Sequence, residues 1–215
     1  MYLSRLQLNS ANRQVWRNII ANPYKVHQMV MRGFFDDVKR EKGDVLHRLD
    51  IRDWGATLLV QSTLKPDWSP INPDYLLPVD PLPNPAVKQV DLPLQVGQAL
   101  SFRLVANPTL KKVRRNENGE RLNSNRVPLL REEEQINWLQ KRAETAGFKL
   151  LSAAISQSQS QKIWKQKGAK PITLYTVQFD GYLEVIQPDN LLAAIKSGIG
   201  PSKAFGCGLL SLARA

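Results

Sequence analysis

Residues 131–155, REEEQINWLQKRAETAGFKLLSAAI, change from a helical to a strand-like pattern at Gly147. Three glutamates open the segment, where their charge complements the dipole of a helix that begins there. Gly147 is the residue type that commonly ends a helix, and the apolar FKLLSAAI after it is typical of a strand. The stretch therefore predicts a helix over 131–147 that leads directly into a strand over 148–155.

The segments around this stretch extend the pattern to the whole second half. We expect a strand over 98–107 before the helix, and another over 172–186 with a turn or bulge at Asp180-Gly181. A short helix over 188–198 and a strand over 209–214 close the chain. Strand, helix, strand, strand, helix, strand is the order of a ferredoxin-like domain.

The first half predicts a second copy of this order. Residues 2–9 fit a strand, and Asn22-Pro23 starts a helix over 23–40. Two further strands are expected over 45–51 and 56–64, before a proline-rich stretch to residue 95. The expected fold class is α+β, with two tandem ferredoxin-like (RRM-like) domains over 1–90 and 91–215, each an antiparallel sheet with its helices on one face.

The composition limits the chemistry that the chain can perform. Of its 215 residues 42% are hydrophobic, which suffices for two small cores. A single cysteine excludes intrachain disulfides and multi-cysteine zinc sites, and it favours a reducing, cytoplasmic location. The two histidines form no HxH or HxxE motif, so we expect neither a metal nor a cofactor. No apolar run approaches the ~20 residues of a membrane span, so no membrane partner is expected. The free chain is expected to be a monomer.

The positive charge is concentrated in two short segments of the second half. The whole chain carries a net charge of +11, of which residues 107–131 (the first basic arm) hold +5 and residues 157–171 (the second basic arm) hold +4. Such clusters bind nucleic acid by displacing condensed counterions, although solvated, flexible insertions have the same composition. The candidate RNA-binding residues in the arms are Lys111, Lys112, Arg114, Arg115, Arg121, Arg126, Lys162, Lys165, Lys167 and Lys170.

A glycine-rich segment near the C-terminus adds a second candidate phosphate contact. Gly198, Gly200 and Gly206 flank Lys203, and glycine lets a backbone approach a ligand closely. The segment is not a Walker motif, because GxxxxGK[ST] is absent, and this argues against a nucleotide triphosphatase. The alternative is a tight turn between a helix and a strand.

The first predicted helix carries the candidate acid–base residues. Tyr24 and His27 are one turn apart on one face, whereas Arg32 lies about 140° further around the helix. An imidazole can take or give a proton, and a nearby cation can offset charge on a pentacoordinate phosphate, which together suffice for metal-free RNA cleavage by the ribose 2′-OH. The alternative is an ordinary helical histidine. His47, on a predicted strand, is interpreted as a packing or hairpin-surface residue.

Seven segments follow one another along nearly the whole chain: MYLSRLQLN (1–9), ANPYKVHQMVMRGF (21–34), LLVQSTLKPDW (58–68), FRLVANPT (102–109), AGFKLL (146–151), VQFDGYLEV (177–185) and GIGPSKAFGCGLLSLAR (198–214). Together they resemble the CasE family, the repeat-cleaving endoribonucleases of type I-E CRISPR systems. The resemblance implies two tandem ferredoxin-like domains. It also implies cleavage of precursor CRISPR RNA at the 3′ base of the repeat stem-loop. From the acid–base residues above we expect this cleavage to be metal-independent, with a 2′,3′-cyclic phosphate or 3′-phosphate product.

The resemblance also implies roles for single residues and for partners. The family's catalytic histidine and tyrosine match His27 and Tyr24, and Arg32 stands where some relatives have an assisting lysine. The hairpin that relatives insert into the RNA stem falls near 157–171, and the chain is expected to stay on the product RNA as a Cascade subunit. The arms would hold the stem, while the first helix and the glycine-rich segment cut. The alternatives are a non-catalytic hairpin-binding or assembly subunit and a general RNA chaperone.

Overall fold

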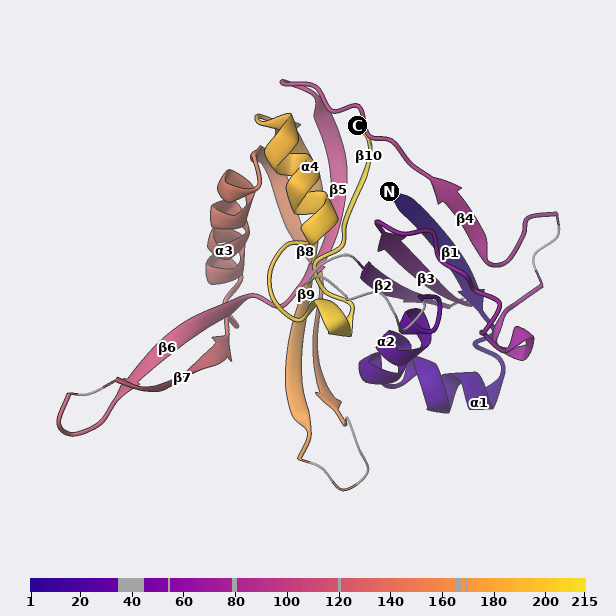
Figure 1. Ribbon diagram of the computed structural model, residues 1–215. Coiled ribbons are helices and arrows are strands. Elements are labelled where there is room, and N and C mark those ends of the chain that lie inside the picture. Colours follow the sequence, from indigo (N-terminus) through magenta and orange to yellow (C-terminus); the bar gives the residue numbers. More distant parts are fainter. Residues whose placement is uncertain (35–44, 54, 79–80, 120, 165–167, 169) are drawn as a thin grey trace.

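The chain folds around two antiparallel four-stranded sheets (Figure 1). The computed structural model describes residues 1–34, 45–53, 55–78, 81–119, 121–164, 168 and 170–215. Each sheet has its own hydrophobic core, one built around the N-terminal strands and the other around the C-terminal strands. Within the described residues no helix has the length and apolar character needed to cross a membrane.

The N-terminal sheet has the strand order β2-β3-β1-β4, which is that of a ferredoxin-like domain. A short 3₁₀ turn, η2, stands between β3 and β4, where such a domain usually has its second helix. The apolar side chains of α2 pack on one face of the sheet and close the core. The elements are β1 (Tyr2–Leu8), α1 (Arg13–Val15), the π-helical turn η1 (Trp16–Ile20), α2 (Pro23–Met31), β2 (Val45–Arg52), β3 (Gly55–Ser62), η2 (Pro73–Tyr75) and β4 (Ala86–Gln89).

The C-terminal sheet repeats this topology with the order β10-β5-β9-β8. Helices α3 and α4 supply Trp138, Leu139, Leu191 and Ile195 to a single core. The predicted α+β fold with two ferredoxin-like units is therefore confirmed. The elements are β5 (Ala99–Ala106), β6 (Thr109–Arg115), β7 (Arg121–Pro128), α3 (Glu132–Thr145), β8 (Phe148–Ile163), β9 (Ile172–Val185), α4 (Pro188–Ser197), the 3₁₀ turn η3 (Lys203–Phe205) and β10 (Leu210–Arg214).

The first long helix is shorter than the sequence predicts. Helix α2 ends at Met31 rather than at residue 40, and residues 35–44 lie outside the described part of the chain. The reason is the packing of Gly33, where an added Cβ would lie 2.4 Å from the indole of Trp68. The Gly33 carbonyl also accepts a hydrogen bond from the Asp67 N–H at 2.9 Å. These contacts take the chain off the helix axis and place it beneath the tryptophan.

Both basic arms contain paired β-strands. The first arm contains the two-stranded ribbon β6–β7, which extends beyond the body of the molecule in Figure 1. In the second arm β8 continues to Ile163 instead of ending at residue 155. The polar residues of β8 pair with β9 along its length, for example Gln157 with Gln178. Backbone pairing with β9 therefore overrides the loop-like composition of this segment.

The bulge predicted near Asp180-Gly181 lies in the partner strand instead. Strand β9 is continuous, whereas β8 shifts register between Leu150 and Ser152 and again between Ile155 and Gln157. Gly181 explains the first shift, because an added Cβ there would lie 2.1 Å from the Ser152 carbonyl oxygen. The glycine thus gives the bulged strand room to approach, rather than bending its own strand.

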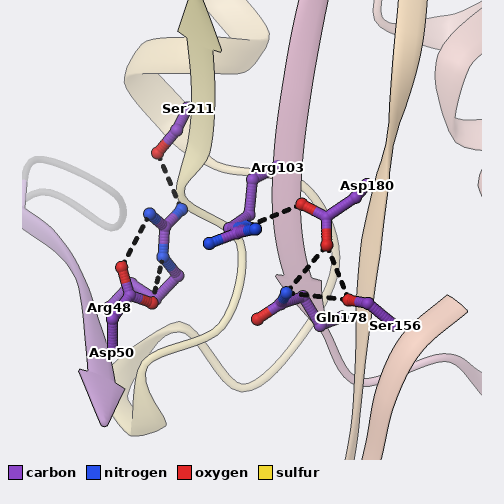
Figure 2. Close-up of polar contacts among 7 residues, drawn as sticks. All are labelled: Arg48, Asp50, Arg103, Ser156, Gln178, Asp180 and Ser211. Carbon is purple, nitrogen blue, oxygen red and sulfur yellow. Dashed lines mark hydrogen bonds and ion pairs between the residues drawn. The ribbon is translucent and has the colours of Figure 1, made fainter. Parts of the chain in front are cut away.

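The two units are joined by specific contacts along β2 and β3. The Gln61 side chain donates a buried hydrogen bond of 2.7 Å to the Ile195 carbonyl at the end of α4. The guanidinium of Arg48, which is only 4% exposed, binds both carboxylate oxygens of Asp50 and donates to the Ser211 hydroxyl of β10 at 2.7 Å (Figure 2). A buried guanidinium requires several partners at once, so this contact fixes the relative position of β2 and β10.

Candidate active site and RNA-binding surface

The N-terminus of α2 positions the two predicted acid–base residues. The Asn22 side chain accepts a 3.0 Å hydrogen bond from the Tyr24 N–H, as a helix N-cap does, and Pro23 follows it at the first helical position. Tyr24 and His27 then lie on one face, with ring centroids 6.4 Å apart and planes tilted by 37°. Both side chains are half-buried at the edge of the helix. The predicted pairing of these two rings is therefore present in the structure.

His47 is a second aromatic neighbour of His27. The two imidazole centroids are 6.1 Å apart and the planes differ by 23°, which is a stacked arrangement. Burial, and then the nearby charge of His27, lower the pKa of His47 from 6.5 to about 3. His47 is therefore neutral in the folded protein at physiological pH. Its Nε2 is buried without a hydrogen-bond partner within the described part of the chain.

The glycine-rich loop 198–208 packs on this histidine and on β2. All four glycines in it have positive φ angles, a conformation that L side chains rarely adopt. An added Cβ at Gly206 would lie 3.8 Å from Cδ2 and Nε2 of His47, and one at Gly198 would lie 2.7 Å from Cδ2 of Leu46. The loop glycines are thus explained by backbone conformation and close packing across the two domains.

Lys203 lies on the turn η3 of this loop, beside α2 and β2. Burial lowers its pKa below the usual 10.5. The preceding Ser202 has a left-handed backbone, with φ of 66°, and its hydroxyl accepts a 2.8 Å hydrogen bond from the Asn107 amide. Asn107 at the end of β5 therefore holds the residue before Lys203 in an unusual conformation.

Some of the predicted basic residues are exposed on the two arms, and others lie outside the described residues. Lys111, Lys112 and Arg126 are exposed on the β6–β7 ribbon, and Lys162 and Lys170 are exposed on the β8–β9 hairpin. The predicted residues Arg114, Arg115 and Arg121 have backbones in β6 and β7. Lys165 and Lys167 lie outside the described residues. Arg32 is exposed as the C-cap of α2.

The second basic arm reaches the candidate active site, which the sequence did not predict. The Asn22 amide donates a 3.1 Å hydrogen bond to the Trp164 carbonyl at the end of β8. A cavity of about 150 Å³ is lined by Pro23, His47 and Gly206 together with Gln159 and Gln161 of β8. The second basic arm and the helix with the acid–base residues are far apart in the sequence, but the fold brings the end of the arm against the start of α2.

The base of the second arm is fixed by a polar network on β5, β8 and β9 (Figure 2). Asp180 accepts hydrogen bonds from Arg103 at 2.6 Å, from Ser156 at 2.6 Å and from Gln178 at 2.8 Å. Burial pushes the pKa of Asp180 upward, but these hydrogen bonds and the Arg103 charge outweigh it and hold the pKa below 3.8. The network joins three strands at the point where β8 shifts register.

The fold and the site together define a class of protein, the RRM-like proteins that combine exposed basic hairpins with a candidate proton-transfer group. The family model described as CRISPR associated protein matches residues 1–214. CRISPR-associated endoribonuclease Cse3 of Thermus thermophilus is 33% identical over 226 residues, which cover 99% of this chain and 100% of that protein. CRISPR system Cascade subunit CasE of Escherichia coli is 41% identical over 132 residues, which cover 59% of this chain and 63% of that protein.

The solved structures give the same relationship. Thermus thermophilus Cse3, bound to an RNA representing a pre-cleavage complex, matches with a TM-score of 0.82 at 32% identity, over 99% of this chain and 98% of that one. The chain belongs to the CRISPR associated protein family, with Cse3 and CasE among its members. The family expected from the sequence is thus confirmed.

Two residues of the site were missed or undervalued by the sequence interpretation. His47 has a weak signal, since it alternates with Val45 and Leu49 and so shares their face of β2. Asn107 has no signal of its own, because its partner Ser202 lies 95 positions away. Neither contact follows from local periodicity, which says nothing about which distant loop covers a strand.

Proposed function

We propose that this protein is an endoribonuclease that processes precursor CRISPR RNA and remains on the product as a Cascade subunit. The observation that carries the proposal is the placement of Tyr24 and His27 at the start of α2, beside a hairpin that belongs to a basic arm. The relationship to Cse3 and CasE supports both the activity and the assembly. Cleavage is proposed at the 3′ base of the repeat stem-loop.

The chemistry of the site favours attack by the substrate's own hydroxyl. The ribose 2′-oxygen forms a bond to the adjacent phosphorus, the bond from phosphorus to the 5′-oxygen breaks, and a 2′,3′-cyclic phosphate and a 5′-hydroxyl result. His27 takes the proton from the 2′-OH or gives one to the leaving 5′-oxygen, and Tyr24 orients it or the nucleophile. Arg32 and Lys203 offset charge on the phosphate. No metal takes part in this proposal.

The basic surface supplies the grip on the RNA stem. An A-form stem presents mainly phosphates and 2′-hydroxyls to a protein, so exposed lysines and arginines on two hairpins suit it. The proposed contacts are the exposed side chains of both arms, the remaining basic residues of those arms, and the backbone of the glycine-rich loop. This part of the proposal predicts affinity for the stem with little dependence on the stem sequence.

The organisation of the chain follows from the same proposal. We place the domain boundary after residue 90, because Val90 donates its N–H to the Met1 carbonyl within the first unit, while β5 opens the second sheet at Ala99. The first domain then carries the acid–base residues and the second carries the arms. A cytoplasmic location fits a protein that works on newly made RNA.

Cleavage of a labelled hairpin repeat RNA tests the proposal. We expect a single cut at the 3′ base of the stem, unaffected by EDTA, and no cut when the sugar just 5′ of the scissile phosphate is 2′-deoxy, although that RNA still binds. His27→Ala is expected to abolish cleavage and to leave binding intact. Cleavage that stops with EDTA would contradict the metal-independent mechanism, and unchanged cleavage by His27→Ala would favour a non-catalytic binding subunit.

A further inference from the structure

His47 occupies the contact between the helix that carries His27 and the sheet beneath it. Only 2% of the residue is exposed, and its ring stacks on that of His27 with centroids 6.1 Å apart. In the antiparallel pairing of β2 with β3 it lies opposite Val60, which is fully buried in the core that α2 closes. The imidazole of His47 is thus part of the surface on which the His27 turn of α2 rests.

The glycine-rich loop holds the same ring from another side. An added methyl at Gly206 would be 3.8 Å from both Cδ2 and Nε2 of His47, so the loop backbone closes over the ring edge. The turn η3 just before Gly206 contacts both α2 and β2. A ring enclosed by a helix, a strand and a loop has little freedom to move, and it transmits its position to whatever stacks on it.

His47 is unsuited to exchange protons with a substrate. It is almost entirely buried, and within the described residues its Nε2 has no hydrogen-bond partner. Burial keeps the ring in the neutral form at physiological pH, because it lowers the pKa to about 3. His47 therefore offers the site a flat, uncharged ring in a fixed position, rather than an acid or a base.

We propose that His47 is a positioning residue for RNA cleavage. Its ring face fixes how far the His27 imidazole lies from strand β2 and how its plane is tilted. The inference rests on the proposed function, in which His27 transfers a proton over a hydrogen-bond distance. Such a transfer needs the heavy atoms about 2.6–3.2 Å apart. A displacement of about 1 Å costs on the order of a hundredfold in rate, so the support beneath His27 matters for the chemical step.

The proposal distinguishes a flat ring from a group that merely fills space. His47→Phe keeps a flat, uncharged ring, His47→Leu fills much of the volume without a flat face, and His47→Ala removes both. Leu58→Ala, a fully buried position on the neighbouring strand β3, is the matched control for lost core stability. Each variant is compared in single-turnover cleavage of a hairpin repeat RNA at saturating protein, in RNA affinity and in thermal unfolding.

We expect His47→Phe to cleave within about threefold of the unmodified protein, and His47→Leu and His47→Ala to cleave about tenfold to a hundredfold more slowly. RNA affinity is expected to change little in all three, and Leu58→Ala is expected to lose stability but keep its rate. If His47→Ala does not fold, the comparison of Phe with Leu decides. The proposal is overturned if His47→Phe and His47→Leu both cleave at the unmodified rate. It is also overturned if His47→Phe is as slow as a slow His47→Leu, which would assign the role to the imidazole nitrogens.

The proposed function and the positioning role of His47 are contradicted by different results. It fails if His27→Ala cleaves normally, whatever the His47 variants do. The positioning role alone fails if His27→Ala is inactive while both His47→Phe and His47→Leu cleave at the unmodified rate.

Discussion

The side-chain amide of Asn22 donates a hydrogen bond to the backbone carbonyl of Trp164, with Nδ2 and O 3.1 Å apart. The same side chain accepts the Tyr24 N–H through its Oδ1. One residue therefore starts the helix that carries His27 and holds the end of β8. If RNA binds along the second basic arm as proposed, this residue connects it to the start of the candidate catalytic helix.

Substitutions at Asn22 separate these two contacts. Asn22→Ser keeps an oxygen that caps the helix but is too short to reach Trp164, whereas Asn22→Ala loses both. We expect Asn22→Ala to have a free energy of unfolding about 1 kcal/mol below that of Asn22→Ser in urea denaturation. Hydrogen exchange of the amides in 157–164 should quicken equally in both. Unchanged exchange in both variants would show that the bond does not hold the hairpin.

The buried Arg48 gives a second prediction, about the contact between domains. Asp50→Asn removes the charge that compensates a guanidinium only 4% exposed, at a cost of about 3 kcal/mol in the free energy of unfolding. Ser211→Ala removes one hydrogen bond from the same group and is expected to cost about 1 kcal/mol. Urea denaturation measures both. Equal losses would mean that the carboxylate of Asp50 stabilises Arg48 no more than the hydroxyl of Ser211 does.

The sequence predicted most of the strands and helices, because these rest on local signals, but it missed α1, the ribbon β6–β7, and β4 in the proline-rich stretch. The Asn22-Pro23 cap, the three glutamates of α3 and the stop at Gly147 are short-range features, and the structure contains all of them. The end of α2 at Met31 was missed, because it depends on Gly33 packing beneath Trp68, 35 positions further on. The confirmed fold therefore owes most to periodicity, and the errors come from tertiary packing.

The candidate site shows the same division between local and distant information. Tyr24 and His27 were predicted to share a face because helical spacing dictates it, and their rings are 6.4 Å apart. The stacking of His47 on His27 and the hydrogen bond from Asn22 to Trp164 join segments that only the fold brings together. Roles for these residues in cleavage stay predictions until variants are assayed.

The glycine-rich loop allows a matched test of conformation against packing. Gly198 and Gly97 have nearly the same φ, 77° and 80°. An added Cβ at Gly97 meets nothing within 4 Å, whereas one at Gly198 would lie 2.7 Å from the fully buried Leu46. We expect Gly97→Ala to cost about 1 kcal/mol of backbone strain. Gly198→Ala is expected to cost about 1–3 kcal/mol more, from overpacking and from a ψ of 149° that L side chains avoid at this φ. Similar unfolding midpoints for the two variants would contradict the packing role of Gly198.

The neutral His47 predicts a pH dependence of stability. Its pKa is 6.5 when unfolded and about 3 when folded. Between these values the unfolded chain binds one more proton, so the free energy of unfolding falls as the pH drops from 6.5 towards 3, by about 1.4 kcal/mol per pH unit from this group. Above pH 6.5 the contribution is complete. Urea denaturation from pH 4.5 to 7.5 should show a steeper fall in the unmodified protein than in His47→Phe.

Histidine NMR checks the same group directly, since the chain has only two histidines. One imidazole signal should stay in the neutral form down to about pH 4, and His47→Phe should remove that signal. The carboxylates that also titrate at low pH are common to both proteins and cancel in the comparison. Two imidazole signals that both titrate near pH 6.5 would show that His47 is accessible to protons in the folded state.

The first basic arm predicts a specific change in the salt dependence of RNA binding. Lys111, Lys112 and Arg126 are exposed on β6–β7 and face solvent in the absence of RNA. If each contacts one phosphate, replacing one by Ala lowers the slope of log affinity against log salt concentration by about 1, because fewer counterions are released.

The matched control is Lys88→Ala, which changes an exposed lysine on the distant strand β4 and should leave the slope unchanged. Filter binding of a hairpin repeat RNA between 50 mM and 200 mM salt, a range over which such contacts change affinity by orders of magnitude, measures the slope. An unchanged slope in all three arm variants would mean that the β6–β7 ribbon does not contact the RNA backbone.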